Sequence, residues 1–95
     1  MAVEVGMLLM SDLLITIKLL FFATIRNRVG LSELSVDFPE SMTVKKLKGY
    51  LGIQFPGLLS AMPSVLVAIN REFAFDEDNI PDKAEVAIFP PVSGG

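Results

Sequence analysis

The sequence predicts one small α+β domain, and three observations support this prediction. Its 95 residues suffice for one compact core but not for two. Several short segments alternate apolar and polar residues with a period of two, which is typical of strands with one buried face. One longer stretch repeats its apolar residues at helical spacing, which is typical of a single amphipathic helix.

The first two strands are predicted over residues 14–22 and 33–38, where apolar and polar positions alternate. Lys18 marks one parity of the first strand as the face open to solvent. The polar segment between the strands, residues 23–30, ends in Gly30 and is predicted to be a turn. The two strands are therefore expected to form a hairpin.

A helix is predicted after Pro39, with Thr43 as its N-cap and Pro56-Gly57 as its stop. Its apolar stripe consists of Val44, Leu47, Leu51 and Phe55. Its outer face carries Lys45, Lys46 and Lys48, which are predicted to be solvated rather than to bind phosphate. Gly49 and Gly52 each cost the helix about 1 kcal/mol relative to Ala, so packing against a sheet must stabilise it.

The second half predicts a strand over 64–70, a short strand containing Phe73 and Phe75, and a strand over 85–89. The acidic loop 76–82 lacks the Gly and distal Glu of an EF-hand and is predicted to be a solvated loop. This element order matches the β-grasp or ubiquitin-like architecture, in which a mixed sheet of about five strands wraps around one main helix.

Composition excludes many functions. The chain has no Cys, His or Trp, which removes disulfides, thiolate nucleophiles, imidazole bases and the usual zinc sites. A net charge of −3 argues against a nucleic-acid partner, because phosphate backbones need clustered Lys and Arg. Lack of Cys is compatible with the cytoplasm, which is the predicted location.

Residues 1–13 are predicted to be a frayed N-terminal extension, with Met10 as an alternative start. Glu4 stands where a signal peptide needs positive charge, and no small-residue cleavage site follows. Asp12 and Lys18 interrupt any apolar run long enough to span a bilayer, so no membrane partner is expected.

The chain ends in a tail, residues 90–95, beyond the predicted domain at 14–89. Pro90 and Pro91 cannot donate to a strand ladder, so they should end the sheet and extend the tail away from the body. Gly94 and Gly95 lack Cβ atoms and offer a thin backbone that could enter a narrow channel in a partner. The alternative is a frayed terminus without function.

The tail and the preceding pattern resemble the small subunits of molybdopterin synthases, which are ubiquitin-like sulfur carriers. The resemblance covers residues 15–95, and its anchors are residues 20–23 with Arg26, residues 55–57, residues 67–70 and the tail. Sulfur carriers of thiamine biosynthesis also end in Gly-Gly but usually lack the Phe-Pro-Pro segment. One departure is Asp82-Lys83-Ala84-Glu85, where the family often shows Asp-Gly-Asp-Glu, so this turn is expected to take another shape.

The resemblance implies that the working group is the carboxylate of Gly95, preceded by Gly94. A ubiquitin-activating-type enzyme would adenylate Gly95 with ATP, and a sulfur donor protein would convert the acyl adenylate to a thiocarboxylate. The large synthase subunit would then pass the sulfur to cyclic pyranopterin monophosphate in molybdenum cofactor biosynthesis. The chain would bind no permanent cofactor or metal and would contribute no catalytic side chain.

By resemblance, Phe22, Phe73 and Phe89 contact both partner proteins, together with Arg26 and the tail residues Pro90, Pro91, Val92 and Ser93. Strand parity supports this for two of the aromatics: Phe22 shares the parity of Lys18, and Phe89 shares that of Glu85. A short strand beside a turn does not fix the face of Phe73. Taken by itself, a lone charge such as Arg26 favours a solvated loop position over a contact with a partner.

Three other functions share the same tail. One is that of a sulfur carrier of another pathway, such as thiamine biosynthesis. In a ubiquitin-like protein modifier, activated Gly95 would be attached to lysines of target proteins. In a plain interaction domain, the tail would be inert.

Overall fold

The computed structural model describes residues 14–91. The predicted N-terminal extension and the last four residues, 92–95, lie outside the described residues. The predictions for Val92, Ser93, Gly94 and Gly95 therefore have no structural counterpart here.

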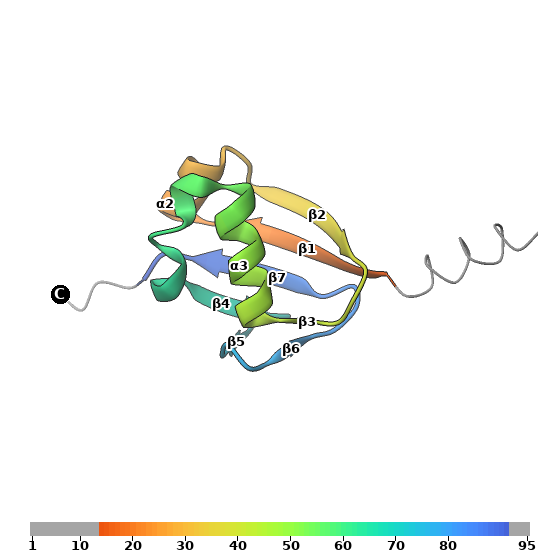
Figure 1. Ribbon diagram of the computed structural model, residues 1–95. Coiled ribbons are helices and arrows are strands. Elements are labelled where there is room, and N and C mark those ends of the chain that lie inside the picture. The colour runs from red at the N-terminus through yellow and green to blue at the C-terminus, as the bar shows by residue number, and fades with distance from the viewer. Residues whose placement is uncertain (1–13, 92–95) are drawn as a thin grey trace, which may run out of the picture.

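A mixed five-stranded sheet forms the body of the domain (Figure 1). Its strand order is β2-β1-β7-β4-β5, and the central pair β1 and β7 is parallel while the other neighbours are antiparallel. The strands are β1 (Ile15–Phe21), β2 (Glu33–Phe38), β4 (Leu66–Ile69), β5 (Glu72–Ala74) and β7 (Glu85–Phe89). This arrangement confirms the predicted α+β fold of the β-grasp type.

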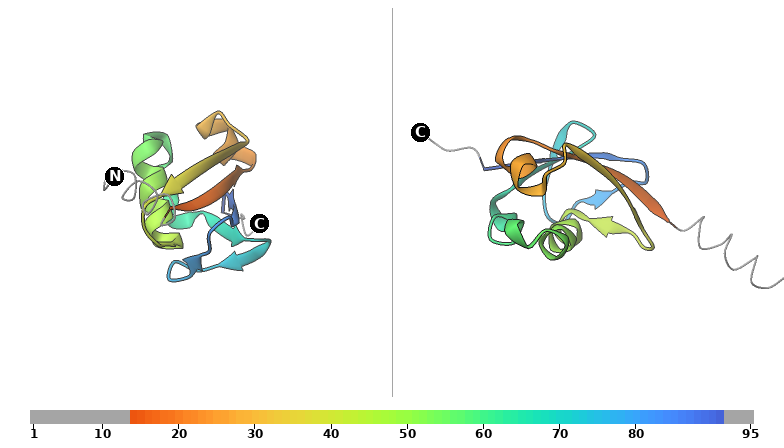
Figure 2. Two further views of the ribbon diagram at one scale, coloured as in Figure 1. Left: turned by 90° about the vertical axis from the view of Figure 1, so that its right-hand side faces the viewer. Right: turned by 90° about the horizontal axis from the view of Figure 1, so that it is seen from above.

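Helix α3 (Val44–Gln54) lies across one face of the sheet (Figures 1 and 2). As predicted, the Thr43 hydroxyl accepts a hydrogen bond from the Lys46 backbone N–H at 3.2 Å, which caps the first turn. The helix ends before Pro56, where the short 3₁₀ helix η1 (Pro56–Leu58) begins, and η2 (Met62–Ser64) follows. The predicted apolar stripe faces the sheet: Val44, Leu47 and Leu51 are buried.

The predicted turn over residues 23–30 was wrong, because this segment forms a second helix, α2 (Ala23–Val29). Ile25 is buried in the core and Val29, one helical turn later, packs against it. Gly30 ends the helix in the left-handed conformation, with φ at 84°. Seven residues are too few for a helix that is stable alone, so the core contact of Ile25 is what holds it.

Two-residue strands that were not predicted pair beside α3: β3 (Met42–Thr43) and β6 (Asn79–Ile80). The acidic loop supplies carbonyl groups to the helix start. The backbone N–H of Val44 donates to the Asp78 carbonyl, and that of Lys45 donates to the Asp76 carbonyl, each at 3.0 Å. The loop thus satisfies two of the N–H groups that a helix N-terminus leaves unpaired.

The core lies between α3 and the sheet. Inward side chains of β1 and β7 are almost fully buried, and α2, η1 and η2 close the ends of the layer with Ile25, Leu58 and Met62. Within residues 14–91 no helix is long and apolar enough to cross a bilayer.

The turn before β7 lacks the glycine found in the related motif. Lys83 nevertheless lies in the left-handed region, with φ at 64°, a conformation that glycine adopts without steric cost. Whether the turn differs in shape from that of relatives with glycine there stays a prediction.

Candidate functional site: an aromatic hollow at the root of the tail

The tail begins at the end of a central strand. Because β7 is parallel to β1, the two strands end at the same edge of the sheet (Figure 1). Phe89, the last residue of β7, therefore lies beside the start of α2. The Phe22 backbone N–H donates to the Ile88 carbonyl at 3.2 Å, which joins the two strand ends. As predicted, β7 ends at Phe89, and Pro90 and Pro91 follow outside the ladder.

Within residues 14–91 the face of the sheet opposite α3 is open, and the side chains on it follow the predicted parity. In β7, Val86 and Ile88 are buried, whereas Glu85, Ala87 and Phe89 are half-buried. The prediction that Phe22 and Phe89 lie on this open face is confirmed: Phe22 is 39% exposed and Phe89 is half-buried beside it.

Three aromatic side chains gather on this face. The rings of Phe22 and Phe89 are stacked, with centroids 4.8 Å apart and planes 11° apart. Phe73, whose face the sequence left open, is 72% exposed. The three rings border a hollow of about 360 Å³. We call it the aromatic hollow; it is lined by Leu20, Phe22, Ala68, Arg71, Phe73, Glu85, Ala87 and Phe89.

The backbone around Phe22 holds its ring against Phe89. The Phe22 carbonyl accepts hydrogen bonds from the N–H groups of Ile25 and Arg26 at 3.1 and 3.3 Å, so Phe22 is the N-cap of α2. Ala23 adopts a left-handed conformation with φ at 52°, which is strained for a residue with a Cβ atom. The sharp turn from β1 into α2 thus begins directly after Phe22, which strand parity places on the open face.

A second turn positions Phe73. Asn70 and Arg71 both have positive φ, 49° and 74°, and they reverse the chain from β4 into β5. The Asn70 side-chain oxygen accepts from the Glu85 N–H at 2.9 Å, and its own N–H donates to the Glu85 carbonyl at 2.8 Å. Phe73 pairs with Ala68 across the strands, and this small neighbour leaves space for the hollow.

Arg26 lies in the last turn of α2, exposed to solvent, and it does not line the aromatic hollow. A cation in that turn interacts favourably with the carbonyl end of the helix. The predicted contact of Arg26 with a partner stays a prediction.

Sequence reasoning did not predict three hollow residues: Ala68, Arg71 and Ala87. The parity of β7 already placed Ala87 on the open face, so its small size was the signal that was overlooked. Ala68 and Arg71 reach the hollow only through the pairing of β4 with β5 and β7, which no local pattern reveals.

The open face also carries charged side chains, of which Arg71 and Glu85 line the aromatic hollow. Lys18 and Glu33 form an ion pair at 3.2 Å on its outer edge, with about half of each side chain exposed. Within residues 14–91 no group of three or more His, Cys, Asp or Glu residues is arranged to hold a metal ion. The apolar part of the open face is thus the aromatic hollow, and polar side chains of β1 and β2 border it, a combination of apolar centre and polar rim that is typical of protein interfaces.

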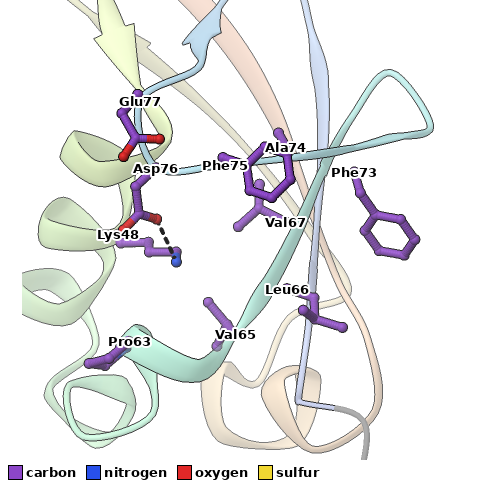
Figure 3. Close-up of a pocket in the computed structure, with 10 residues that line it drawn as sticks. All are labelled: Lys48, Pro63, Val65, Leu66, Val67, Phe73, Ala74, Phe75, Asp76 and Glu77. Carbon is purple, nitrogen blue, oxygen red and sulfur yellow. Dashed lines mark hydrogen bonds and ion pairs between the residues drawn. The ribbon is translucent and has the colours of Figure 1, made fainter.

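The edge strand β5 separates this face from a second groove (Figure 3). Phe75 and the ion pair between Lys48 and Asp76, at 2.8 Å, belong to that groove, and Phe73 lines both this groove and the aromatic hollow. Phe73 therefore borders both surfaces, whereas Phe75 borders only the second groove.

Comparison with known proteins agrees with this geometry. The model of the ThiS family matches residues 19–95, from the middle of β1 through the tail. The chain belongs to the ThiS family. A curated relative from Arabidopsis thaliana, the molybdopterin synthase sulfur carrier subunit, is 35% identical over 85% of this chain and 84% of its own length. The Escherichia coli protein of the same name is 37% identical over 83% of this chain and 99% of its own.

Among solved structures, the small archaeal modifier SAMP1 from Haloferax volcanii superposes with a TM-score of 0.72 at 27% identity. The match covers 84% of this chain and 99% of that one. The predicted β-grasp fold and the predicted relationship to sulfur carriers are both confirmed.

Proposed function

We propose that this chain is the sulfur carrier subunit of a molybdopterin synthase. The observation that carries the proposal is the position of the aromatic hollow: it adjoins the end of β7, from which Pro90 and Pro91 lead toward Gly95. A partner that binds the hollow through Phe22 and Phe89 would receive the tail at a fixed distance from that contact. The names of the curated relatives, which align over most of their length, support the same function.

The chemistry would take place at the carboxylate of Gly95. An adenylating enzyme of the ubiquitin-activating type would transfer AMP from ATP to this carboxylate, with release of pyrophosphate. A sulfur donor protein would displace AMP and leave a thiocarboxylate, which is a soft nucleophile. The large synthase subunit would then accept the tail, and two such sulfur transfers to cyclic pyranopterin monophosphate would produce the dithiolene of molybdopterin.

The residues of this chain suit a carrier better than a catalyst. Without Cys or His, the chain offers neither a thiol nucleophile nor an imidazole base, so catalytic side chains would come from the partners. Its own contribution would be to present the tail. The cytoplasmic location and the need for ATP stay predictions.

Deletion of Gly95 tests the proposal directly. The new carboxylate on Gly94 would lie one residue short, up to roughly 3.3–3.6 Å, and a misplacement of even about 1 Å can cost on the order of 10²-fold in rate. We expect the shortened chain to bind the large subunit with parent affinity, through the unchanged aromatic hollow, but to support no molybdopterin formation. AMP release, thiocarboxylate mass and pterin product would be measured for both chains. Parent-like product formation by the shortened chain would contradict the carrier mechanism.

A protein modifier is the second candidate, because the fold also matches an archaeal protein with the word modifier in its name. Both functions begin with the same acyl adenylate at Gly95. Intact mass distinguishes them: replacement of oxygen by sulfur adds about 16 Da, whereas a modifier forms conjugates with lysines of other proteins. A chain that gains neither mass nor conjugates would be an interaction domain with an inert tail.

A further inference from the structure

We propose that the apolar stretch at residues 7–10 binds to its own domain, in a groove between α3 and the end of β2. The stretch reads Met-Leu-Leu-Met and precedes the described residues. The family match begins at residue 19, so the stretch lies outside the part of the chain that the family model covers. The proposal does not depend on the proposed function.

The groove has a volume of about 440 Å³ and is mostly apolar. Its floor is the edge-to-face pair of Phe38 and Tyr50, with ring centroids 4.9 Å apart. Ile53, which is 76% exposed, stands at its far end. A Cβ atom added at Gly49 would have no neighbouring atom within 4 Å, so the side of the groove formed by α3 is open at this residue. The lining residues are Phe38, Glu40, Met42, Lys46, Gly49, Tyr50 and Ile53.

The entry point of the chain lies at the mouth of this groove. Ile15, at the start of β1, pairs with Phe38 of the groove floor, and β3 and the end of β2 lie on the side where β1 begins (Figure 1). From Lys46 to Ile53 the helix rises roughly 10 Å, at about 1.5 Å per residue. Four extended residues span roughly 13 Å, so residues 7–10 match the length of the groove.

The aromatic hollow is a poorer site for the same stretch. Phe22 follows the last residue of β1, and the strand from Ile15 to Phe21 measures roughly 20 Å at about 3.3 Å per residue. Met10 stands only four residues before Leu14 and reaches at most roughly 14 Å. The stretch would therefore leave the hollow and the root of the tail uncovered.

Charge favours the α3 groove as well. Residues 1–13 contain Glu4 and Asp12 but no Lys or Arg. The groove is lined by one cation, Lys46, and one carboxylate, Glu40. These two charges lie 3.8 Å apart and are exposed, so Lys46 can also pair with a carboxylate of the N-terminal stretch.

Because the chain lacks Cys, a single Gly6→Cys substitution allows one nitroxide label next to the apolar stretch. In the amide spectrum of labelled chain we expect loss of the Gly49 and Ile53 signals and their return after the label is reduced. Ile53→Glu should abolish this effect. Leu59→Glu, at a position that is 62% exposed outside the groove, is the matched control and should leave the effect unchanged.

Other occupants give different results. Signal loss in unlabelled isotope-enriched chain mixed with labelled chain would mean that a second copy occupies the groove and would overturn the proposal. Loss of the Phe22 and Phe89 amide signals instead would place the stretch in the aromatic hollow and would overturn the proposal. The proposal would also be overturned if no amide signal were lost.

Tyr50 provides an independent measurement, because it is the only Tyr in a chain without Trp. Deletion of residues 1–12 should increase iodide quenching of its fluorescence, since the stretch would no longer cover the ring. Equal quenching of full-length and shortened chains would contradict the proposal.

Discussion

The two faces of the sheet differ most sharply at consecutive residues. Phe21 is 2% exposed and contacts Phe55 edge-on across the core, whereas Phe22 is 39% exposed and stacks on Phe89. The same contrast separates Ile88 from Phe89 at the end of β7. The covered face is filled by α3, while the open face carries side chains of similar size without any element of residues 14–91 above them. Aromatic content alone therefore does not distinguish a core from an interface; strand parity does.

The largest change in stability is expected from a substitution on the covered face. Phe21→Ala is expected to reduce the free energy of unfolding by about 3–5 kcal/mol, because it removes a fully buried ring and leaves a cavity. Phe22→Ala is the matched control and should cost about 1 kcal/mol, mainly the stacking with Phe89. Urea unfolding of the two variants measures both values. Equal losses would mean that the two faces do not differ in their contribution to stability.

The second prediction concerns the affinity of the open face for the large subunit. Phe89→Ala should weaken binding to the large subunit by about 2 kcal/mol or more, the usual cost of removing an aromatic anchor, while stability falls by only about 1 kcal/mol. Phe75→Ala removes an equally large exposed ring outside the aromatic hollow and should leave the affinity unchanged. Calorimetric titration measures the affinity of each variant, and melting curves measure its stability. A large loss of stability at parent affinity would assign Phe89 to the core.

The strands were predictable where the pattern was local. β2 and β7 have the predicted bounds because apolar and polar residues alternate between turn-forming residues at both ends. Helix α2 was missed because the run of Arg26, Asn27 and Arg28 reads as a turn. The i, i+4 pair of Ile25 and Val29 was the signal for a helix, but its stability depends on a core contact that sequence does not display.

The candidate site was likewise predictable where its residues lie in a local strand pattern. Parity placed Phe22 and Phe89 on the open face because each lies in or next to a regular strand with a charged neighbour of the same parity. Phe73 could not be placed, since its face depends on two left-handed residues, Asn70 and Arg71, and on register with Ala68. Long-range register is the information that a single sequence lacks.

The two glycines of α3 extend the comparison to the helix. Gly49 is exposed with free space at its Cβ position, so Gly49→Ala should stabilise the fold by about 1 kcal/mol through helix propensity. Gly52 is buried, and a Cβ there would lie 2.8 Å from a terminal methyl of Leu59. Gly52→Ala should therefore gain less, because Leu59 must move. Urea unfolding compares them, and a larger gain at Gly52 would contradict the close approach.

The smallest effect should come from the polar border of the open face. Lys18 and Glu33 are about half exposed, so water and salt screen their attraction and the side chains lose entropy on pairing. A double-mutant cycle with Lys18→Met and Glu33→Gln should give a coupling energy of about 0.2–1 kcal/mol that falls as salt is added. Ile17, next in sequence and fully buried, provides the contrast, since Ile17→Val should cost about 0.5–1.5 kcal/mol at any salt concentration. A coupling above about 2 kcal/mol, insensitive to salt, would mean that the border of the open face stabilises the fold in the way the core does. The division between a face for stability and a face for partners would then no longer hold at this edge.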